Sequence, residues 1–305
     1  MIGLNAIIPN DLGGKARGKR FERFHPLVSF LYYAGSVVLL FFMLHPLFLG
    51  IGFVVVLAVN FIHDRLSGLR RWIFFIITCL FFMVILNPLF NERGRYVLFE
   101  MGNHRFTLEA FVYGGMNALS IITVIALFVS YNVVMTPNKL LFLFGKFLPQ
   151  FAVLLMLTLR FMPLMRRRVE EISVIQRSKG ISISHGKWKV KAKIGMQYVQ
   201  VLLTHSLEEA IQTADSMKAR GYGQGIRSSY EYFRFRKIDF IAFFYLSFLF
   251  AILLFGRIFG YGYFTIYPIM ESWQLSMMEV RILVCYLLFL GFPLLVEAGE
   301  MSRWR

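Results

Sequence analysis

Two short segments of this 305-residue chain place a cation beside a glycine. They read Arg177-Ser178-Lys179-Gly180 and Ala219-Arg220-Gly221. A lysine ammonium or an arginine guanidinium can bind a carboxylate through charge-assisted hydrogen bonds, which are stronger than neutral ones. Because the same device occurs twice in one basic stretch, we interpret it as a pair of motifs that dock against a partner.

Apolar periodicity predicts that each motif ends an amphipathic helix. Before the second motif, apolar or small residues recur every three or four positions, at Met196, Val199, Leu203, Leu207, Ala210, Ala214 and Met217. Before the first, Met165, Val169, Ile172 and Ile175 do the same. A glycine ends a helix well because it adopts the left-handed conformation without a steric penalty, and a cation suits the negative end of the helix dipole. Ordinary helix capping would look the same, so a purely structural role for the motifs stays open.

Composition and charge point to a membrane. Apolar residues make up 57% of the chain and lie in long blocks, as in a protein that crosses a bilayer several times. The net charge of +16 is concentrated in segments that flank these blocks, as the positive-inside rule requires. Anionic lipid headgroups therefore account for the basic character better than nucleic acid does.

Six apolar blocks have the length of membrane-spanning helices. They are Leu27–Leu44, Leu47–Ile62, Trp72–Phe90, Phe106–Tyr131, Ile238–Phe255 and Val280–Val296. We predict an all-α polytopic membrane protein with about six transmembrane helices, two long amphipathic cytoplasmic helices, and both termini in the cytoplasm. Residues 1–26 would be a basic cytoplasmic tail, 27–131 the first four spans, 132–237 a cytoplasmic or interfacial region, and 238–305 the last two spans with a short tail.

Two further segments carry expectations about topology. The block 140–164 is interrupted by Gly145-Lys146, Pro149 and Arg160, and a crossing there would place the basic region outside. We expect this block to lie in the cytoplasmic interface or to pack against the bundle, and to lead into a helix that begins near Leu164. Residues 91–105 have mixed charge and are expected to form an extracellular loop.

The sequence resembles the transmembrane T component of energy-coupling factor (ECF) transporters at Gln176-Arg177-Ser178-Lys179-Gly180 and at Lys218-Ala219-Arg220-Gly221-Tyr222. That family carries two short Ala-Arg-Gly-like motifs in one cytoplasmic region, and here Lys179 and Arg220 are 41 positions apart. The first motif departs from the family pattern because it has lysine in place of arginine. Lysine lacks the planar fork that binds a carboxylate with two hydrogen bonds, so either Lys179 or its neighbour Arg177 would be the anchor.

This resemblance implies a role without catalysis, in an importer of the ATP-binding cassette (ABC) class. The two amphipathic helices would be coupling helices, each docking into one cytoplasmic ATPase subunit, and a small substrate-binding membrane subunit (the S component) would be the third kind of partner. The chain itself would bind no cofactor, because ATP and magnesium belong to the ATPases. The location would be the bacterial cell membrane, and the transported vitamin or metal ion stays open, as does whether the module serves one S component or several.

Other classes of function fit the sequence less well. An integral membrane enzyme would need titratable groups gathered at one depth, but the six histidines are scattered. Glu170-Glu171 and Glu208-Glu209 are adjacent pairs, whose side chains point to different sides of a helix. A stand-alone channel or secondary transporter would be expected to carry charges or broken helices at the membrane midplane. These alternatives remain second to the coupling role.

Overall fold

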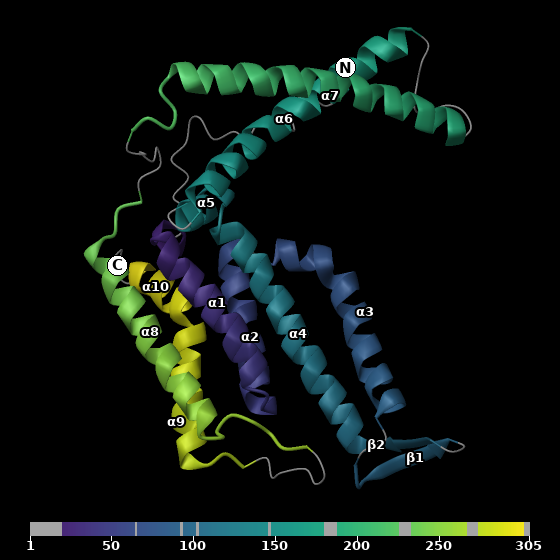
Figure 1. The fold of residues 1–305 in the computed structure, drawn as a ribbon. Helices are drawn as coiled ribbons and strands as arrows, with labels where there is room; N and C mark the ends of the chain where they lie inside the picture. Colours follow the sequence, from purple (N-terminus) through teal and green to yellow (C-terminus); the bar gives the residue numbers. More distant parts are fainter. Residues whose placement is uncertain are drawn as a thin grey trace. The chain divides into compact units, whose positions relative to one another are not determined.

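The computed structural model describes residues 20–64, 66–91, 94–101, 104–145, 148–179, 188–225, 233–266 and 274–301. These residues form ten α-helices, one short 3-10 helix and one two-stranded hairpin (Figure 1). The chain divides into two compact units, residues 1–140 with 233–305, and residues 141–232. We call them the membrane unit and the helix-pair unit. The predicted all-α polytopic fold is confirmed.

Each of the six predicted spans is helical in the membrane unit. The helices are α1 (Pro26–Phe42), α2 (Pro46–Asp64), α3 (Ser67–Phe90), α4 (Leu108–Val134), α8 (Lys237–Ile258), α9 (Met277–Leu290) and α10 (Phe292–Met301). Among the described residues α2, α3, α4 and α8 are long and apolar enough to cross a membrane. The helices α9 and α10 reach that length only as a pair bent by 60°, and α1 is a shorter apolar helix of 17 residues.

The bend between α9 and α10 leaves backbone groups that a membrane helix must still satisfy. Tyr32 of α1 is fully buried, and its hydroxyl donates a hydrogen bond of 2.8 Å to the carbonyl of Leu290, the last residue of α9. Around it lies an aromatic core in which the Phe21 ring is 5.4 Å from Tyr32 and 6.1 Å from Phe292. The last predicted span is therefore a broken helix that side chains from the N-terminal end of the chain support.

Small residues let the helices of this unit approach closely. A Cβ atom on Gly114 would lie 3.0 Å from the Met83 carbonyl oxygen and from the Asn87 Cβ, so α3 and α4 meet here almost backbone to backbone. A Cβ atom on the next residue, Gly115, would meet nothing within 4 Å. Of the small residues in this part of α4, Gly114 is therefore the one whose lack of a side chain the α3–α4 packing requires.

Buried polar groups stabilise the end of the membrane unit at which α1 and α8 begin. The Asp239 carboxylate accepts hydrogen bonds from the backbone N–H groups of His25 (3.1 Å) and Arg236 (2.9 Å), and so serves the starts of both α1 and α8. Lys139, in the short helix α5 (Pro137–Gly145), donates to the carbonyls of Glu22 (2.7 Å) and Val134 (2.8 Å). Burial lowers the pKa of the Lys139 ammonium, although the nearby Glu22 acts in the opposite direction.

The connection between α3 and α4 differs from the predicted loop. It contains an antiparallel hairpin of β1 (Val97–Met101) and β2 (His104–Thr107), in which Phe99 pairs with Phe106. Phe106 therefore belongs to a strand, and α4 begins at Leu108, later than the predicted start of the fourth span. Periodicity missed the hairpin because strands of four and five residues leave too short a pattern to separate from a loop.

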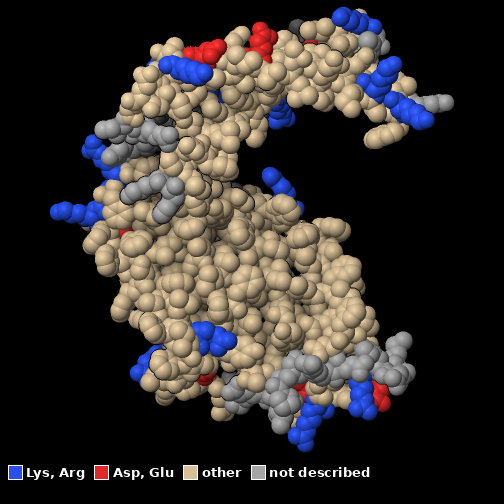
Figure 2. Space-filling model, viewed as in Figure 1, with Lys and Arg blue, Asp and Glu red and all other residues tan. Residues whose placement is uncertain are grey.

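The surface of the membrane unit has the charge distribution of a membrane protein. On the face shown in Figure 2, a broad belt without charged side chains separates charges at its two ends. Such a belt fits the apolar interior of a bilayer.

Candidate docking surface on the crossed helices

The helix-pair unit is built on two long helices, α6 (Pro149–Ser178) and α7 (Trp188–Ala219). The prediction that the first helix begins near Leu164 is wrong. It begins 15 residues earlier, at Pro149, because a proline fits the first turn of a helix, where a missing N–H costs nothing. The helix then continues through Pro163. Neither helix is among the candidate membrane spans of the described residues.

The two helices cross and touch near their middles (Figure 1). The Ser206 hydroxyl of α7 lies 3.1 Å from the Met165 sulfur of α6. Tyr198 is the one described residue of α7 that is buried, with 7% of its surface exposed, and no described residue of α6 is buried. The contact between the helices is therefore confined to a small patch at the crossing.

The first basic motif lies at the exposed end of α6. Ser178 is the last helical residue and its hydroxyl donates to the carbonyl of Ile175 (2.7 Å). Lys179 caps the helix with its backbone N–H directed at the carbonyls of Gln176 and Arg177. Arg177, Ser178 and Lys179 are all exposed, whereas Gly180 lies outside the described residues.

The second basic motif ends α7 in the way that the sequence predicts. Gly221 has φ = +78°, in the left-handed region, and its N–H donates to the Lys218 carbonyl (2.9 Å). The Tyr222 N–H donates to the Met217 carbonyl (3.0 Å), which completes the pattern of a glycine-terminated helix. Ala219 and Arg220 are exposed and Gly221 is half-buried. The glycine stop is confirmed at this motif.

Both motif cations are available to a partner. Within the described part of the chain, neither Lys179 nor Arg220 forms an ion pair with another side chain; the one ion pair of this unit joins Arg168 to Glu171 at 3.5 Å. In Figure 1 the two helices end on opposite sides of their crossing. The motifs therefore present two separate cationic tips rather than one shared basic patch.

The predicted apolar stripe of α7 does not face α6. Its members Met196, Val199, Leu203 and Leu207 are exposed, and Leu203 has 63% of its surface uncovered by the chain. A second row, at spacings of four, is instead covered to a greater extent: Ile194, Tyr198, Leu202 and Ser206. Sequence reasoning missed this second row, although its spacing of four residues was a usable signal. A continuous apolar face of α7 is thus left open.

The two motifs are placed evenly about the crossing. Lys179 stands 14 positions beyond Met165, and Arg220 stands 14 positions beyond Ser206. At 1.5 Å of rise per helical residue, each cation lies about 20 Å along its helix from the contact. The helix pair is therefore a crossed structure with two arms of equal length, each ending in a cation.

Comparison with known proteins identifies the family. Residues 19–232, which include both motifs and both long helices, match the family CbiQ, described as cobalt transport protein. The match covers more than half of the chain. The chain belongs to the CbiQ family.

Relatives of this CbiQ family member are transporter components. It is 26% identical over 280 residues to the energy-coupling factor transporter transmembrane protein EcfT of Lactobacillus helveticus, a match that covers 84% of this chain and 99% of the relative. It is 25% identical over 248 residues to EcfT of Staphylococcus aureus (72% and 90%) and 29% identical over 177 residues to EcfT of Leuconostoc gelidum (53% and 64%). The resemblance to the T component of ECF transporters is confirmed, and the chain is a multi-pass transmembrane component of that kind.

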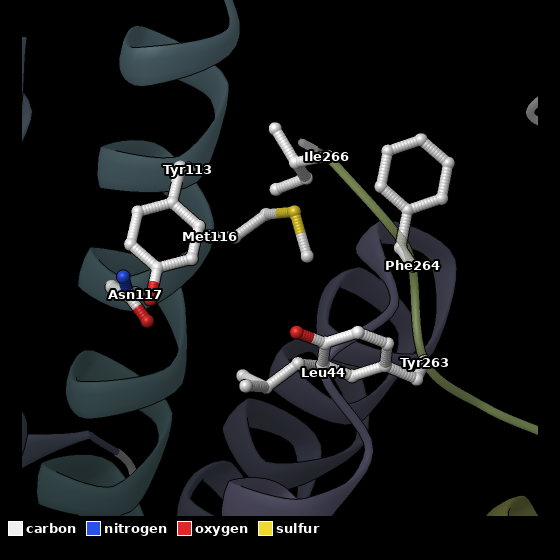
Figure 3. A pocket seen from close by; sticks show the side chains of 7 residues that line it. All are labelled: Leu44, Tyr113, Met116, Asn117, Tyr263, Phe264 and Ile266. Carbon is white, nitrogen blue, oxygen red and sulfur yellow. The ribbon is translucent and has the colours of Figure 1, made fainter. Parts of the chain in front are cut away.

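A pocket in the membrane unit of this CbiQ family member is small. It lies between the α1–α2 turn, α4 and the segment after α8, and it is lined by Leu44, Tyr113, Met116, Asn117, Tyr263, Phe264 and Ile266 (Figure 3). Figure 3 shows the Met116 side chain reaching from α4 into the space beside Leu44, Tyr263 and Ile266. The free volume of about 10 Å³ is near the minimum for one water molecule. This pocket is too small to bind a vitamin.

The CbiQ family is one of membrane components of transporters, and the relatives of this chain are transporter components as well. Among the described residues, no group of three or more histidine, cysteine, aspartate or glutamate side chains is arranged to hold a metal ion. The features that stand out for function are therefore the cationic tips and the open apolar face of α7.

Proposed function

We propose that this chain is the energy-coupling subunit of an ECF-type ABC importer. It docks two ATPase subunits, one at each basic motif, and passes their ATP-driven movement to a separate substrate-binding membrane subunit. The docking residues are Arg177, Ser178, Lys179 and Gly180 at the first tip, and Ala219, Arg220 and Gly221 at the second. ATP and magnesium are bound by the ATPases, and this chain transmits force.

The equal arms are the observation that carries this proposal. Two cations at matched distances from one crossing suit two partners that are alike and act together, as a pair of ATPases does. When such partners move toward each other, the tips follow and the angle between α6 and α7 changes. The small contact around Met165 and Ser206 favours such a change, because few side chains have to repack.

The open face of α7 supports docking for a second reason. A cation alone forms an exposed ion pair, which contributes little binding free energy. Apolar side chains that become buried beside it contribute more, since they form the centre of most protein interfaces. Leu203 and Leu207 are exposed in the chain by itself and lie on the arm that ends in Arg220.

The distribution of cations supports an orientation of the chain in which both basic motifs face the cytoplasm. In the sequence, most cations lie in the N-terminal segment and in residues 132–237, while Arg93, Arg95, Arg105, Arg257 and Arg281 fall in or beside segments expected on the outer side. Both termini and both motifs then face the cytoplasm of a bacterial cell, where the ATPases would be.

Affinity purification from the native host tests this function. The tagged wild-type chain is compared with a double variant, Lys179→Glu with Arg220→Glu, which reverses both tips. We expect two ATPase subunits, identical or different, to purify with the wild type and to be lost from the variant. A matched control, Lys189→Glu with Lys193→Glu, changes the net charge by the same amount at exposed positions near the start of α7.

The control separates docking from general charge. ATPases that stay with the control but leave the tip variant support the proposal, provided that both variants insert in the membrane as the wild type does. Retention of the ATPases by the tip variant would overturn it and would leave the motifs as helix caps. Absence of ATPases from the wild type in mild detergent would also overturn it.

A further inference from the structure

The hairpin between α3 and α4 has two chemically different faces. Phe99 lies opposite Phe106, and their rings stack with centroids 4.5 Å apart. Glu100 lies opposite Arg105, and the carboxylate and guanidinium form an ion pair at 3.2 Å. Since neighbouring residues of a strand point to opposite sides, the aromatic pair occupies one face and the ion pair the other.

The hairpin is held firmly on α4. Glu109, in the first turn of that helix, is fully buried and accepts hydrogen bonds from the backbone N–H groups of Arg95 (2.9 Å) and Tyr96 (3.0 Å). The Leu108 N–H donates to the Tyr96 carbonyl (2.9 Å). The orientation of the hairpin is therefore set by the helix that follows it.

The neighbouring helices place the hairpin at a membrane boundary. Both α3, with 24 residues, and α4, with 27, are long and apolar enough to cross a bilayer, so the segment that joins them lies at its surface. Figure 1 shows the hairpin at the ends of α3 and α4, extending sideways from them. It therefore lies along the surface of the membrane instead of projecting away from it.

Apolar surface continues from α3 to the hairpin. Only 6% of the apolar window of α3 is buried within the chain, and Phe90 at its end is exposed, as is Phe99 in β1. Aromatic side chains are favoured at the level of the lipid headgroups, and arginines such as Arg105 suit their phosphates. A two-stranded hairpin is marginally stable in water, so burial of one face in lipid would also stabilise this one.

We propose that this hairpin is an interfacial anchor that binds the phospholipid surface. Its Phe99 and Phe106 face lies against the acyl chains just below the headgroups, and its Glu100 and Arg105 face lies toward water. The occupant of the aromatic face is lipid rather than another protein. The hairpin thereby attaches the α3–α4 end of the membrane unit to one leaflet, independently of the helix-pair unit and of the docking function proposed above.

Spin labels on the full chain test the anchor. The chain is reconstituted into vesicles of phosphatidylcholine and phosphatidylglycerol, with both native cysteines replaced (Cys79→Ser and Cys285→Ser). One sample carries a label at Phe99→Cys and the other at Glu100→Cys, adjacent positions on opposite faces. We expect the ratio of collisions with oxygen, which concentrates in lipid, to collisions with a water-soluble nickel chelate to be several-fold higher at position 99 than at position 100.

The other outcomes overturn the proposal. If the nickel chelate reaches both positions equally, the hairpin stands in water. If neither reagent reaches position 99, a protein covers the aromatic face, whether a second copy or another subunit. Should Phe99→Cys fail to fold, Phe106→Cys and Arg105→Cys give the same comparison on β2, because they are also adjacent and on opposite faces.

Discussion

The Asp239 carboxylate accepts a hydrogen bond of 3.1 Å from the backbone N–H of His25, a residue 214 positions earlier in the chain. The same carboxylate accepts one of 2.9 Å from the Arg236 N–H. Because the first turn of a helix has N–H groups without intrahelical partners, one buried side chain here satisfies groups at the starts of two helices, α1 and α8.

Replacement of the carboxylate should loosen this junction. We expect Asp239→Asn to lower the free energy of unfolding by about 1–2 kcal/mol, because the amide offers one acceptor oxygen without charge where two N–H groups need one each. Thermal unfolding of the purified chain in detergent measures the effect. Asp215→Asn, on the exposed surface of α7, is the matched control and should leave stability unchanged. Equal stability of the two variants would contradict the double capping role.

Stability should fall in mild acid through His25. Burial lowers the pKa of His25 below its usual value of 6.5, an effect larger than the opposing attraction of Asp239. The unfolded chain then takes up the proton first, so the contribution of His25 to stability is present above pH 6.5 and is lost as pH falls through the lower folded pKa. Protonation would also remove the acceptor nitrogen Nδ1, which lies 3.3 Å from the Leu27 N–H.

A histidine pair tests this pH dependence. The unfolding temperature is followed from neutral pH to below the usual histidine pKa in the wild type, in His25→Asn and in His205→Asn, whose position on α7 is exposed. The acid-dependent fall should be reduced in His25→Asn and kept in His205→Asn. An equal fall in all three proteins would assign the acid sensitivity to other groups.

Two adjacent glycines of α4 should respond differently to the same substitution. Gly114→Ala would place a methyl group 3.0 Å from the Met83 carbonyl oxygen, which belongs to the backbone and cannot turn away. Separating α3 from α4 should cost about 1–3 kcal/mol. Gly115→Ala meets nothing within 4 Å and should be neutral or slightly stabilising, since alanine favours a helix over glycine. Thermal unfolding of both variants in the same detergent tests whether the close approach of Gly114 to Met83 stabilises the packing of α3 against α4.

Two residues of α7 should separate folding from docking. Tyr198 is the buried described residue of α7, with 7% exposure, so Tyr198→Ala should destabilise the helix-pair unit by about 2–4 kcal/mol and speed its cleavage by protease. Leu203 has 63% exposure, so Leu203→Ala should change the stability of the isolated chain by less than about 0.5 kcal/mol. The same Leu203 variant should lose ATPase subunits more readily during purification. Full retention of the ATPases would exclude this face of α7 from docking.

Local sequence determined the parts of this protein that depend on near neighbours. The six apolar blocks become helices because each is long enough to cross a bilayer, where a helix satisfies all backbone hydrogen bonds within its own segment. The second basic motif ends its helix because only glycine adopts φ = +78° at Gly221 without strain. The motif residues, their spacing of 41 and the family resemblance could likewise be read from the sequence by itself.

Tertiary structure alone decided what depends on distant contacts. That Met165 meets Ser206, and so gives the arms equal lengths, depends on how two helices pack, and a helix with apolar residues on two sides can pack through either. The stripe with the more regular apolar pattern is the one left open, while Tyr198, outside that stripe, is buried. The bend at Gly291 also depends on a partner far away in the chain, because the Tyr32 hydroxyl donates to the Leu290 carbonyl. Periodicity describes one segment at a time and holds no information on which surface another segment will cover.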